Sequence, residues 1–307
     1  ALTSRYLLNP YAVATCVAKS MSTLRVFFVV VAMSSAAAGA SRRLAFTHAV
    51  ACILFYTPVL LTPPLVLLGA ESYAEYGAWR TQFGRRRSDA WSLFVWHTLR
   101  RMVLTAIALL VLSALLSQDG TWRFLGSVYG SRILIDDLAP SSGTVWYFFV
   151  QIFAHFRAFF TFVVNVHLWA YVAPVTLKYR AEPLFSASVL YGVVCLFQNY
   201  PSLGDTALFV ALWSLFAVRL GDYLRYPMVT FLLFAYSTLL LPAFHYLWLY
   251  AGSANANFYF AINLVHAIAL GSLVLDAVWA WGRERWELER PTATGKDVRT
   301  RRVVVQA

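Results

Sequence analysis

A short run of small and polar residues separates two long apolar stretches near the end of this 307-residue sequence. Ser253, Asn255 and Asn257 lie in this run, between Tyr250 and Phe258. Amide side chains donate to and accept from sugar hydroxyls and phosphate oxygens, and the small neighbours let a ligand come close. The same residues also suit a turn at Asn255 and a helix cap at Asn257. Ligand contact and local capping are therefore both open.

A second polar joint, Tyr200-Pro201-Ser202-Leu203-Gly204, precedes Asp205. Pro and Gly interrupt the apolar pattern here, so we expect the joint to separate two short helices and to lie at membrane depth. Asp205 then begins a helix, where a carboxylate is stabilised by the helix dipole. Capping explains Asp205 by itself, and a contact to a polar headgroup is the alternative.

Aromatic side chains crowd around one histidine and one arginine between Trp146 and Phe160. Such a run is typical of the aromatic belt at a membrane surface, followed by core packing. The alternative is a groove for acyl chains or a lipid headgroup. In that case Tyr147 and Phe156 lie in the aromatic run, and His155 and Arg157 supply the polar contacts.

The chemistry of a hydrolase or a metalloenzyme is not indicated. There is no His-Glu-x-x-His motif, no two of the six histidines are three or four residues apart, and the three cysteines are isolated. Asp136-Asp137 is either solvated or suited to a divalent cation. We predict no catalytic residue, no metal site and no cofactor.

The composition is that of an integral membrane protein. Hydrophobic residues make up 60% of the chain and charged residues only 13%, against about 25% charged in soluble domains. The net charge of +11 comes without a polar segment that joins basic residues to stacking aromatics, so nucleic acid is not an expected partner.

The apolar runs predict an all-α polytopic fold with about eight spans. We expect the fourth span to end at Pro174. The predicted helices are 24–40, 44–68, 91–116, 144–175, 184–199, 204–218, 227–250 and 258–281.

Most of the 25 Lys and Arg residues fall near residues 80–87, 178–180 and 219–225 and after residue 281. By the positive-inside rule these segments face the cytoplasm, including the C-terminus. Residues 41–43, 118–143, 200–204 and 253–257 then share the opposite side. We expect one transmembrane domain, residues 1–282, and a basic cytoplasmic tail, residues 283–307.

Several motifs together resemble the PIG-U family, the multispanning subunit of the glycosylphosphatidylinositol (GPI) transamidase, from about residue 7 to the tail. The run Ala251-Gly252-Ser253-Ala254-Asn255 is the most specific of them. The others are Asn9-Pro10-Tyr11, Ser20 after Cys16-Val17-Ala18-Lys19, Trp146-Tyr147-Phe148-Phe149, His155-Phe156, and Tyr200-Pro201-x-x-Gly204-Asp205.

The resemblance implies a fold like that of the GT-C-type membrane mannosyltransferases, with about a dozen spans, so we expect the first spans and the first lumenal loop to lie outside this sequence. It implies a multi-pass protein of the endoplasmic reticulum membrane that is not itself catalytic. The implied partners are the caspase-like catalytic subunit PIG-K, together with PIG-T, GPAA-type and PIG-S-type subunits and the GPI lipid.

The resemblance also turns the polar joints into candidate GPI contacts. The residues expected to bind GPI are Ser253, Asn255, Asn257, Tyr147, His155, Phe156, Arg157, Tyr200 and Asp205. Two other functions remain open: a GT-C-type glycosyltransferase acting on GPI precursors, and a scaffold that only holds other subunits together.

Overall fold

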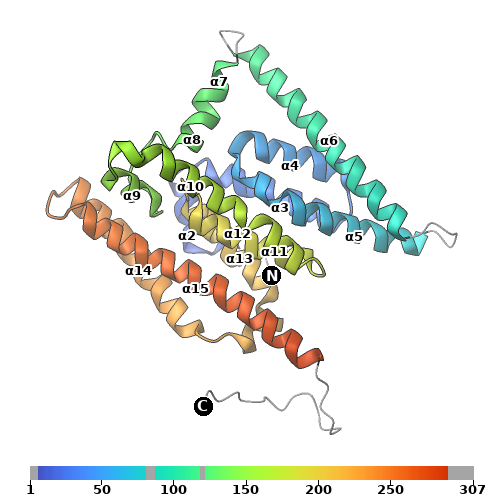
Figure 1. Ribbon diagram of the computed structural model, residues 1–307. Helices are drawn as coiled ribbons and strands as arrows, with labels where there is room; N and C mark the ends of the chain where they lie inside the picture. Colours follow the sequence, from blue (N-terminus) through green and yellow to red (C-terminus); the bar gives the residue numbers. More distant parts are fainter. Residues whose placement is uncertain (1–5, 81–86, 118–121, 290–307) are drawn as a thin grey trace, which may run out of the picture.

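The computed structural model describes residues 6–80, 87–117 and 122–289, with the side chains of residues 76–80 and 87–89 left aside. This part of the chain contains helices and connecting turns and no strand, which confirms the predicted all-α class. The helices, shown in Figure 1, are α2 (Pro10–Val17), α3 (Ser22–Ala37), α4 (Ser41–Phe55), η1 (Thr57–Leu61), α5 (Thr62–Arg80), α6 (Arg87–Leu116), α7 (Arg123–Leu125), η2 (Gly126–Gly130), α8 (Ser131–Leu134), α9 (Val145–Gln151), η3 (Ala154–Phe156), α10 (Arg157–Ala170), α11 (Val172–Lys178), α12 (Pro183–Phe197), α13 (Leu203–Leu220), η4 (Gly221–Tyr223), α14 (Pro227–Leu249) and α15 (Ala256–Glu289).

Within these residues, five helical segments are long and apolar enough to cross a membrane: 90–116, 154–178, 203–223, 227–249 and 256–289. Helices α3 and α12 are also apolar but shorter. The chain is therefore a polytopic membrane protein, and the predicted number of eight spans is approximate.

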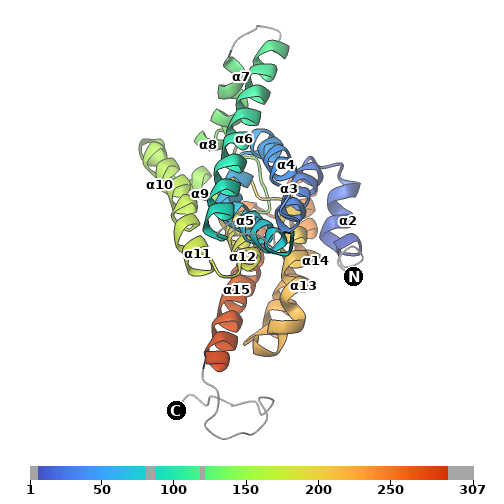
Figure 2. The ribbon, with the colours of Figure 1, turned by 90° about the vertical axis from the view of Figure 1, so that its right-hand side faces the viewer.

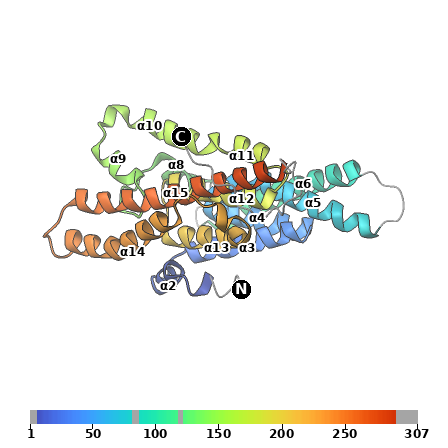
Figure 3. The ribbon, with the colours of Figure 1, turned by 90° about the horizontal axis from the view of Figure 1, so that it is seen from below.

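Helix α12 forms the centre of the bundle, because nearly all of its side chains from Pro183 to Cys195 are buried. It packs against α5, α11, α13 and α15. Figures 1 and 3 show the α14–α15 hairpin on one side of α12 and the α5–α6 pair on the other. Figure 2 shows α10 and α11 on one side of this core and α2 and α3 on the opposite side. Helices α6 and α14 are long enough to cross a membrane, and most of their side chains lie outside this core.

The predicted continuous helix over residues 44–68 is wrong. Helix α4 ends at Phe55, and Tyr56 takes a left-handed φ of 59° before the 3₁₀ turn that contains Pro58. Proline removes a backbone donor and disfavours the α conformation of the residue before it, so an unbroken helix cannot pass this point. The chain reverses there and returns as α5.

This reversal also moves residues 41–43, which the sequence grouped with the extracytoplasmic joints. Gly39 lies against the backbone of Tyr73 in α5, and the Ser41 hydroxyl is 2.8 Å from that of Thr98 in α6. These contacts put residues 41–43 at the opposite end of α3 from the joint at residues 200–204. Two helices that run in opposite directions thus replace the single helix predicted over residues 44–68, so the residues before the break do not lie at the end of the bundle where the sequence placed them.

The fourth predicted span is also divided. Helix α9 ends at Gln151, Ile152 and Phe153 are extended, and the chain becomes helical again from Ala154. Pro174 does not end the span, because it lies in the first turn of α11, where no N–H is needed inside the helix. The last helix runs past the predicted end at residue 281 to Glu289, and residues 290–307 lie outside the described part.

Charged side chains join three helix ends at the face predicted to meet the cytoplasm. Glu182, just before α12, binds Arg219 of α13 at 2.7 Å and also pairs with Arg285 of α15. Arg219 also contacts Glu284 at 2.9 Å. Burial raises the pKa of the Glu182 carboxyl, but the hydrogen bonds and charges of the two arginines outweigh it and leave that pKa below its usual value.

We expect Glu182→Gln to lower stability by about 1 kcal/mol or less, because the arginines are partly exposed and water screens the pairs. The Glu182 pKa is depressed on folding, so its contribution is present above the pKa of the unfolded carboxyl and is lost as pH falls through the folded value. Thermal unfolding in detergent at neutral pH and at a pH well below the ordinary Glu pKa of about 4.3 tests this. A difference between wild type and variant that persists unchanged at the acidic pH would contradict it.

Candidate functional site

A cavity of about 360 Å³ opens where α3 and α13 begin, next to the loop that holds α8. Eight of its ten lining residues are polar or charged. The lining residues are Ser20, Met21, Ser22, Arg25, Phe55, Ser131, Arg132, Asp137, Tyr200 and Ser202. The joint at residues 200–204, predicted to face the extracytoplasmic side, therefore forms part of a real cavity.

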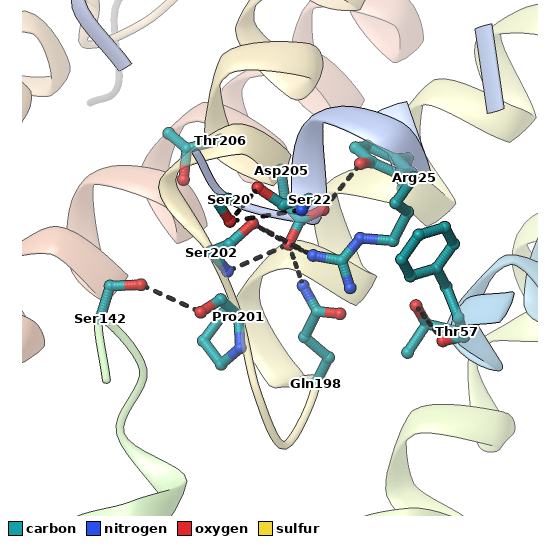
Figure 4. A network of polar contacts seen from close by, with 12 residues as sticks. Ser20, Ser22, Arg25, Thr57, Ser142, Gln198, Pro201, Ser202, Asp205 and Thr206 are labelled. Carbon is teal, nitrogen blue, oxygen red and sulfur yellow. Dashed lines mark hydrogen bonds and ion pairs between the residues drawn. The ribbon is translucent and has the colours of Figure 1, made fainter. Parts of the chain in front are cut away.

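Arg25 of α3 lines the cavity and forms an ion pair with Asp205 of α13 behind it, which Figure 4 shows at the centre of a polar network. Both side chains are buried, at 8% and 3% exposure. Two charges removed from water in this way need close pairing and further hydrogen bonds to offset their lost hydration. Arg25 is 180 positions from Asp205 in the sequence.

Asp205 receives those further hydrogen bonds. One carboxylate oxygen accepts from the Gln198 side chain at 2.8 Å and from the backbone N–H and hydroxyl of Ser202 at 3.0 and 2.9 Å. The other oxygen accepts from the Tyr191 hydroxyl at 3.1 Å. Asp205 is thus fully engaged within the protein. Its carboxylate fixes Arg25 at the cavity wall.

The local sequence explains how α13 begins at this point. Ser202 is the N-cap residue and Asp205 occupies the third helical position, so their side chains and backbone N–H groups form a reciprocal capping box. Gly204 lets this turn approach α3, because a Cβ at residue 204 would lie 2.8 Å from the Ser22 hydroxyl. The capping role predicted for Asp205 is therefore present, with the buried ion pair added to it.

Arg132 of α8 is the second cation of the cavity. Its guanidinium makes no hydrogen bond or ion pair with any described residue, and it lies between the main cavity and a smaller one of about 20 Å³. Burial, and then the nearby charge of Arg25, lower the pKa of Arg132. The smaller cavity has room for about one water molecule and is lined by polar groups that include Gln198 and Asn199.

Tyr200 and Arg157, two predicted site residues, hold the loop beside the cavity. The Tyr200 hydroxyl accepts from the backbone N–H of Asp137 at 3.2 Å and donates to the carbonyl of Ser131 at 3.4 Å. Burial is the main reason why the pKa of Tyr200 is raised. Arg157 donates to the carbonyl of Ile135 at 2.7 Å, so it supports the loop from α10.

Ser253, Asn255, Asn257 and Tyr147 form a separate group at the tip of the α14–α15 hairpin. Asn255 accepts from the backbone N–H groups of Asn257 and Phe258 at 3.0 and 3.3 Å and so caps α15. Asn257 lies within α15 and accepts from the Tyr147 hydroxyl. The capping function belongs to Asn255, two residues earlier than Asn257, where the sequence alternative placed the cap. Ser253, Asn255 and Asn257 are exposed.

His155 and Phe156 belong to neither group. Both lie in the exposed 3₁₀ turn η3, with their rings edge to face at 5.2 Å. The structure thus distributes the predicted residues over the cavity, the hairpin tip and this turn. No three His, Cys, Asp or Glu side chains of the described residues come together as metal ligands.

The sequence interpretation missed Arg25, Arg132 and Gln198 as cavity residues. Arg25 had one signal, since a basic residue inside an apolar membrane run is costly unless it has a partner or a polar cavity. Arg132 had none, because a single arginine in a long loop is typical of a solvated surface. Only the fold brings it over α3.

Comparison with known proteins supports the family. A family model described as "PIG-U: GPI transamidase subunit PIG-U" matches residues 1–266. The chain belongs to the PIG-U family. It is 31% identical over 292 residues to the human "GPI-anchor transamidase component PIGU", covering 92% of this chain and 63% of that protein. It is 37% identical over 185 residues to the Saccharomyces cerevisiae "GPI transamidase component GAB1", covering 60% of this chain and 47% of that protein.

The chain thus spans less than two thirds of the length of these PIG-U relatives. The family match includes the cavity, both polar joints and the first part of α15, since it extends to residue 266. The sequence resemblance to the PIG-U family is confirmed.

Proposed function

We propose that this chain is a non-catalytic membrane subunit of a GPI transamidase complex, which attaches GPI anchors to proteins in the endoplasmic reticulum. Its role is to bind the GPI lipid and present it to a caspase-like catalytic subunit. The observation that carries this proposal is the polar cavity with an unpaired arginine at the end of an apolar bundle. We propose GPI as the ligand because the chain belongs to the PIG-U family of GPI transamidase subunits.

The two parts of a GPI lipid match two kinds of surface on this bundle. Its acyl chains need an apolar surface within the membrane, and its phosphoglycan headgroup needs donors and acceptors at the membrane surface. The exposed aromatic side chains of η3 and α10, including Phe156 and Phe159, offer the first. The cavity and the hairpin tip offer the second.

The proposed partners are the other transamidase subunits, equivalents of PIG-K, PIG-T and the GPAA-type and PIG-S-type proteins. Helices α6 and α14 expose long apolar faces. Only 11% and 17% of the residues in their 18-residue apolar stretches are buried within the chain. In a membrane such faces contact lipid or another subunit. The contacts of the Asp205 carboxylate with Arg25, Ser202 and Gln198 support a structural role for this residue.

The hairpin tip gives a direct test of headgroup binding. Asn257→Ala removes the exposed amide, whereas Tyr147→Phe removes only its partner hydroxyl within the protein. If Asn257 contacts the headgroup, Asn257→Ala lowers GPI attachment about fivefold, the effect of losing one hydrogen bond. Tyr147→Phe then leaves attachment within about twofold of wild type. Surface display of a GPI-anchored reporter, in cells that depend on the full-length variant, measures this.

Assembly with the other subunits, measured by co-purification, must stay normal for both variants. Gln151→Ala, which removes an exposed amide outside the hairpin tip, is the matched control and should leave attachment unchanged. Equal losses for Asn257→Ala and Tyr147→Phe would mean that the pair only fixes α9 to α15, and normal attachment in Asn257→Ala would remove the tip from the proposed site.

A further inference from the structure

The main cavity contains a cation that nothing in the described protein neutralises. Arg132 lines it without an ion pair or hydrogen bond, although part of its surface is buried. A partly buried charge that lacks a counter-ion raises the free energy of the empty site, and a bound anion relieves this cost. The lowered pKa of Arg132 is consistent with that cost. The site is therefore prepared for a negatively charged group.

Arg25 supplies a second, independent sign of a ligand. It is 6% exposed and lines the same cavity, and one of its terminal nitrogens is committed to Asp205 and Ser202. Its Nε is buried and has no hydrogen-bond partner in the described protein. Unpaired buried donors are rare in folded proteins, so each one requires an explanation. A ligand oxygen or a water molecule that fills the site would provide it.

We infer that this cavity binds the phosphate group of a lipid headgroup, with Arg132 as the main contact, Arg25 as the second and the serines of the α3 start as neutral donors. The inference rests on the proposed function and deepens it, since it assigns the phosphate of the lipid to a place. The Ser20 and Ser22 hydroxyls are 2.9 Å apart on the wall that faces the cavity. Guanidinium groups bind phosphate oxygens through two parallel N–H bonds, which makes arginine well suited to this ligand.

The acidic residue of the cavity does not cancel this preference. Asp137 also lines the wall, but one of its carboxylate oxygens accepts from the backbone N–H of Ala139 at 2.9 Å. It is exposed, so water screens its charge. Asp205 is fully occupied by its own donors. A volume of about 360 Å³ holds a phosphate group with an attached sugar-sized ring.

The position of α8 favours a lipid as the source of the phosphate. Ser131 and Arg132 of this short helix line the cavity, whereas Ile133 and Leu134 are 37% and 55% exposed. A segment with one polar and one apolar side is typical of the membrane surface, where lipid headgroups lie. This surface lies beside the exposed aromatic side chains of α10. Arg157 and Asn165 of α10 hold the α8 loop there, because they donate hydrogen bonds to its backbone carbonyls.

The inference is tested by lipid retention in the full-length protein, purified within its assembled complex. Native mass spectrometry after incubation with phosphatidylinositol measures the bound lipid, and diacylglycerol serves as the probe with the same tails and no phosphate. We expect Arg132→Gln to lower phosphatidylinositol retention about tenfold, the effect of losing a charged hydrogen bond. Arg132→Lys retains part of it, because the charge remains. Arg123→Gln, an exposed arginine of the same loop outside the cavity, changes nothing.

Equal retention by wild type and Arg132→Gln would overturn the inference, as would equal losses of phosphatidylinositol and diacylglycerol. Inorganic phosphate is added in a parallel arm. If it occupies the site as tightly as the lipid, the source is free phosphate and the lipid assignment is wrong. Reporter attachment in the same cells separates the two proposals. Attachment that depends on Asn257 but not on Arg132 overturns this inference alone, whereas a wild-type complex that retains no lipid overturns the proposed function too.

Discussion

Asp205→Ala lowers the free energy of unfolding by about 3–5 kcal/mol, the expected result of leaving one member of a buried ion pair without its partner. Arg25 would remain inside the bundle with its charge uncompensated, and Gln198 and Tyr191 would lose their acceptor. The α13 capping box would be lost as well. Thermal unfolding of the detergent-purified full-length protein measures the effect, together with the yield of assembled complex.

Two comparisons show whether the uncompensated charge is the cause. Asp136→Ala removes an exposed carboxylate next to Asp137 of the cavity wall and is expected to change stability by less than about 0.5 kcal/mol. The double variant Arg25→Met/Asp205→Leu removes both charges and should recover part of the loss, since well-packed apolar replacements of buried pairs are often tolerated. A double variant less stable than Asp205→Ala would contradict this explanation.

Gly192→Val is the second substitution with a large expected effect. Gly192 lies in the central helix α12, where a Cβ would be 2.5 Å from the Phe209 ring of α13 and 2.8 Å from Val274 of α15. These neighbours are buried in the main core, so neither can move into open space. Overpacking of this kind typically costs about 1–3 kcal/mol, and a Cβ closer than 3 Å to two buried side chains places Gly192→Val at the upper end of that range. We expect a marked fall in thermal stability and in complex yield.

Gly271→Ala provides the matched control for this core position. A Cβ at residue 271 meets only Leu196, at the ordinary distance of 3.7 Å. Alanine also favours the helix over glycine by about 1 kcal/mol, so Gly271→Ala should be neutral or slightly stabilising. If both glycine variants unfold at the wild-type temperature, α12 does not pack as closely as the structure places it.

Sequence reasoning recovered what local chemistry determines. The apolar runs and the joint at residues 200–204 place the starts of α12, α14 and α13 within one residue of those in the structure. The break at Tyr56 was missed because apolar residues continue on both sides of it, although Pro58 was a signal. That single omission misplaced residues 41–43.

The site was harder to predict because its contacts are distant in sequence. Arg25 and Asp205 are 180 positions apart, and Tyr147 and Asn257 are 110 apart. A sequence pattern indicates which residues are polar inside a membrane, but only the packing of α3 against α13 decides that Arg25 is paired. Arg132 lies over the cavity because the loop through α8 folds back toward α3, a course that no local motif specifies.

Photocrosslinking from the cavity tests the central claim most directly. Benzoyl-phenylalanine replaces Tyr200, which lines the cavity, or Tyr226, which is 52% exposed at the start of α14 at the other end of the bundle. The account predicts that radiolabelled GPI precursor crosslinks to the full-length protein from position 200 and not from position 226, and that Arg132→Gln reduces the signal at position 200. A crosslink of equal strength from both positions, or one at position 226 alone, would contradict it.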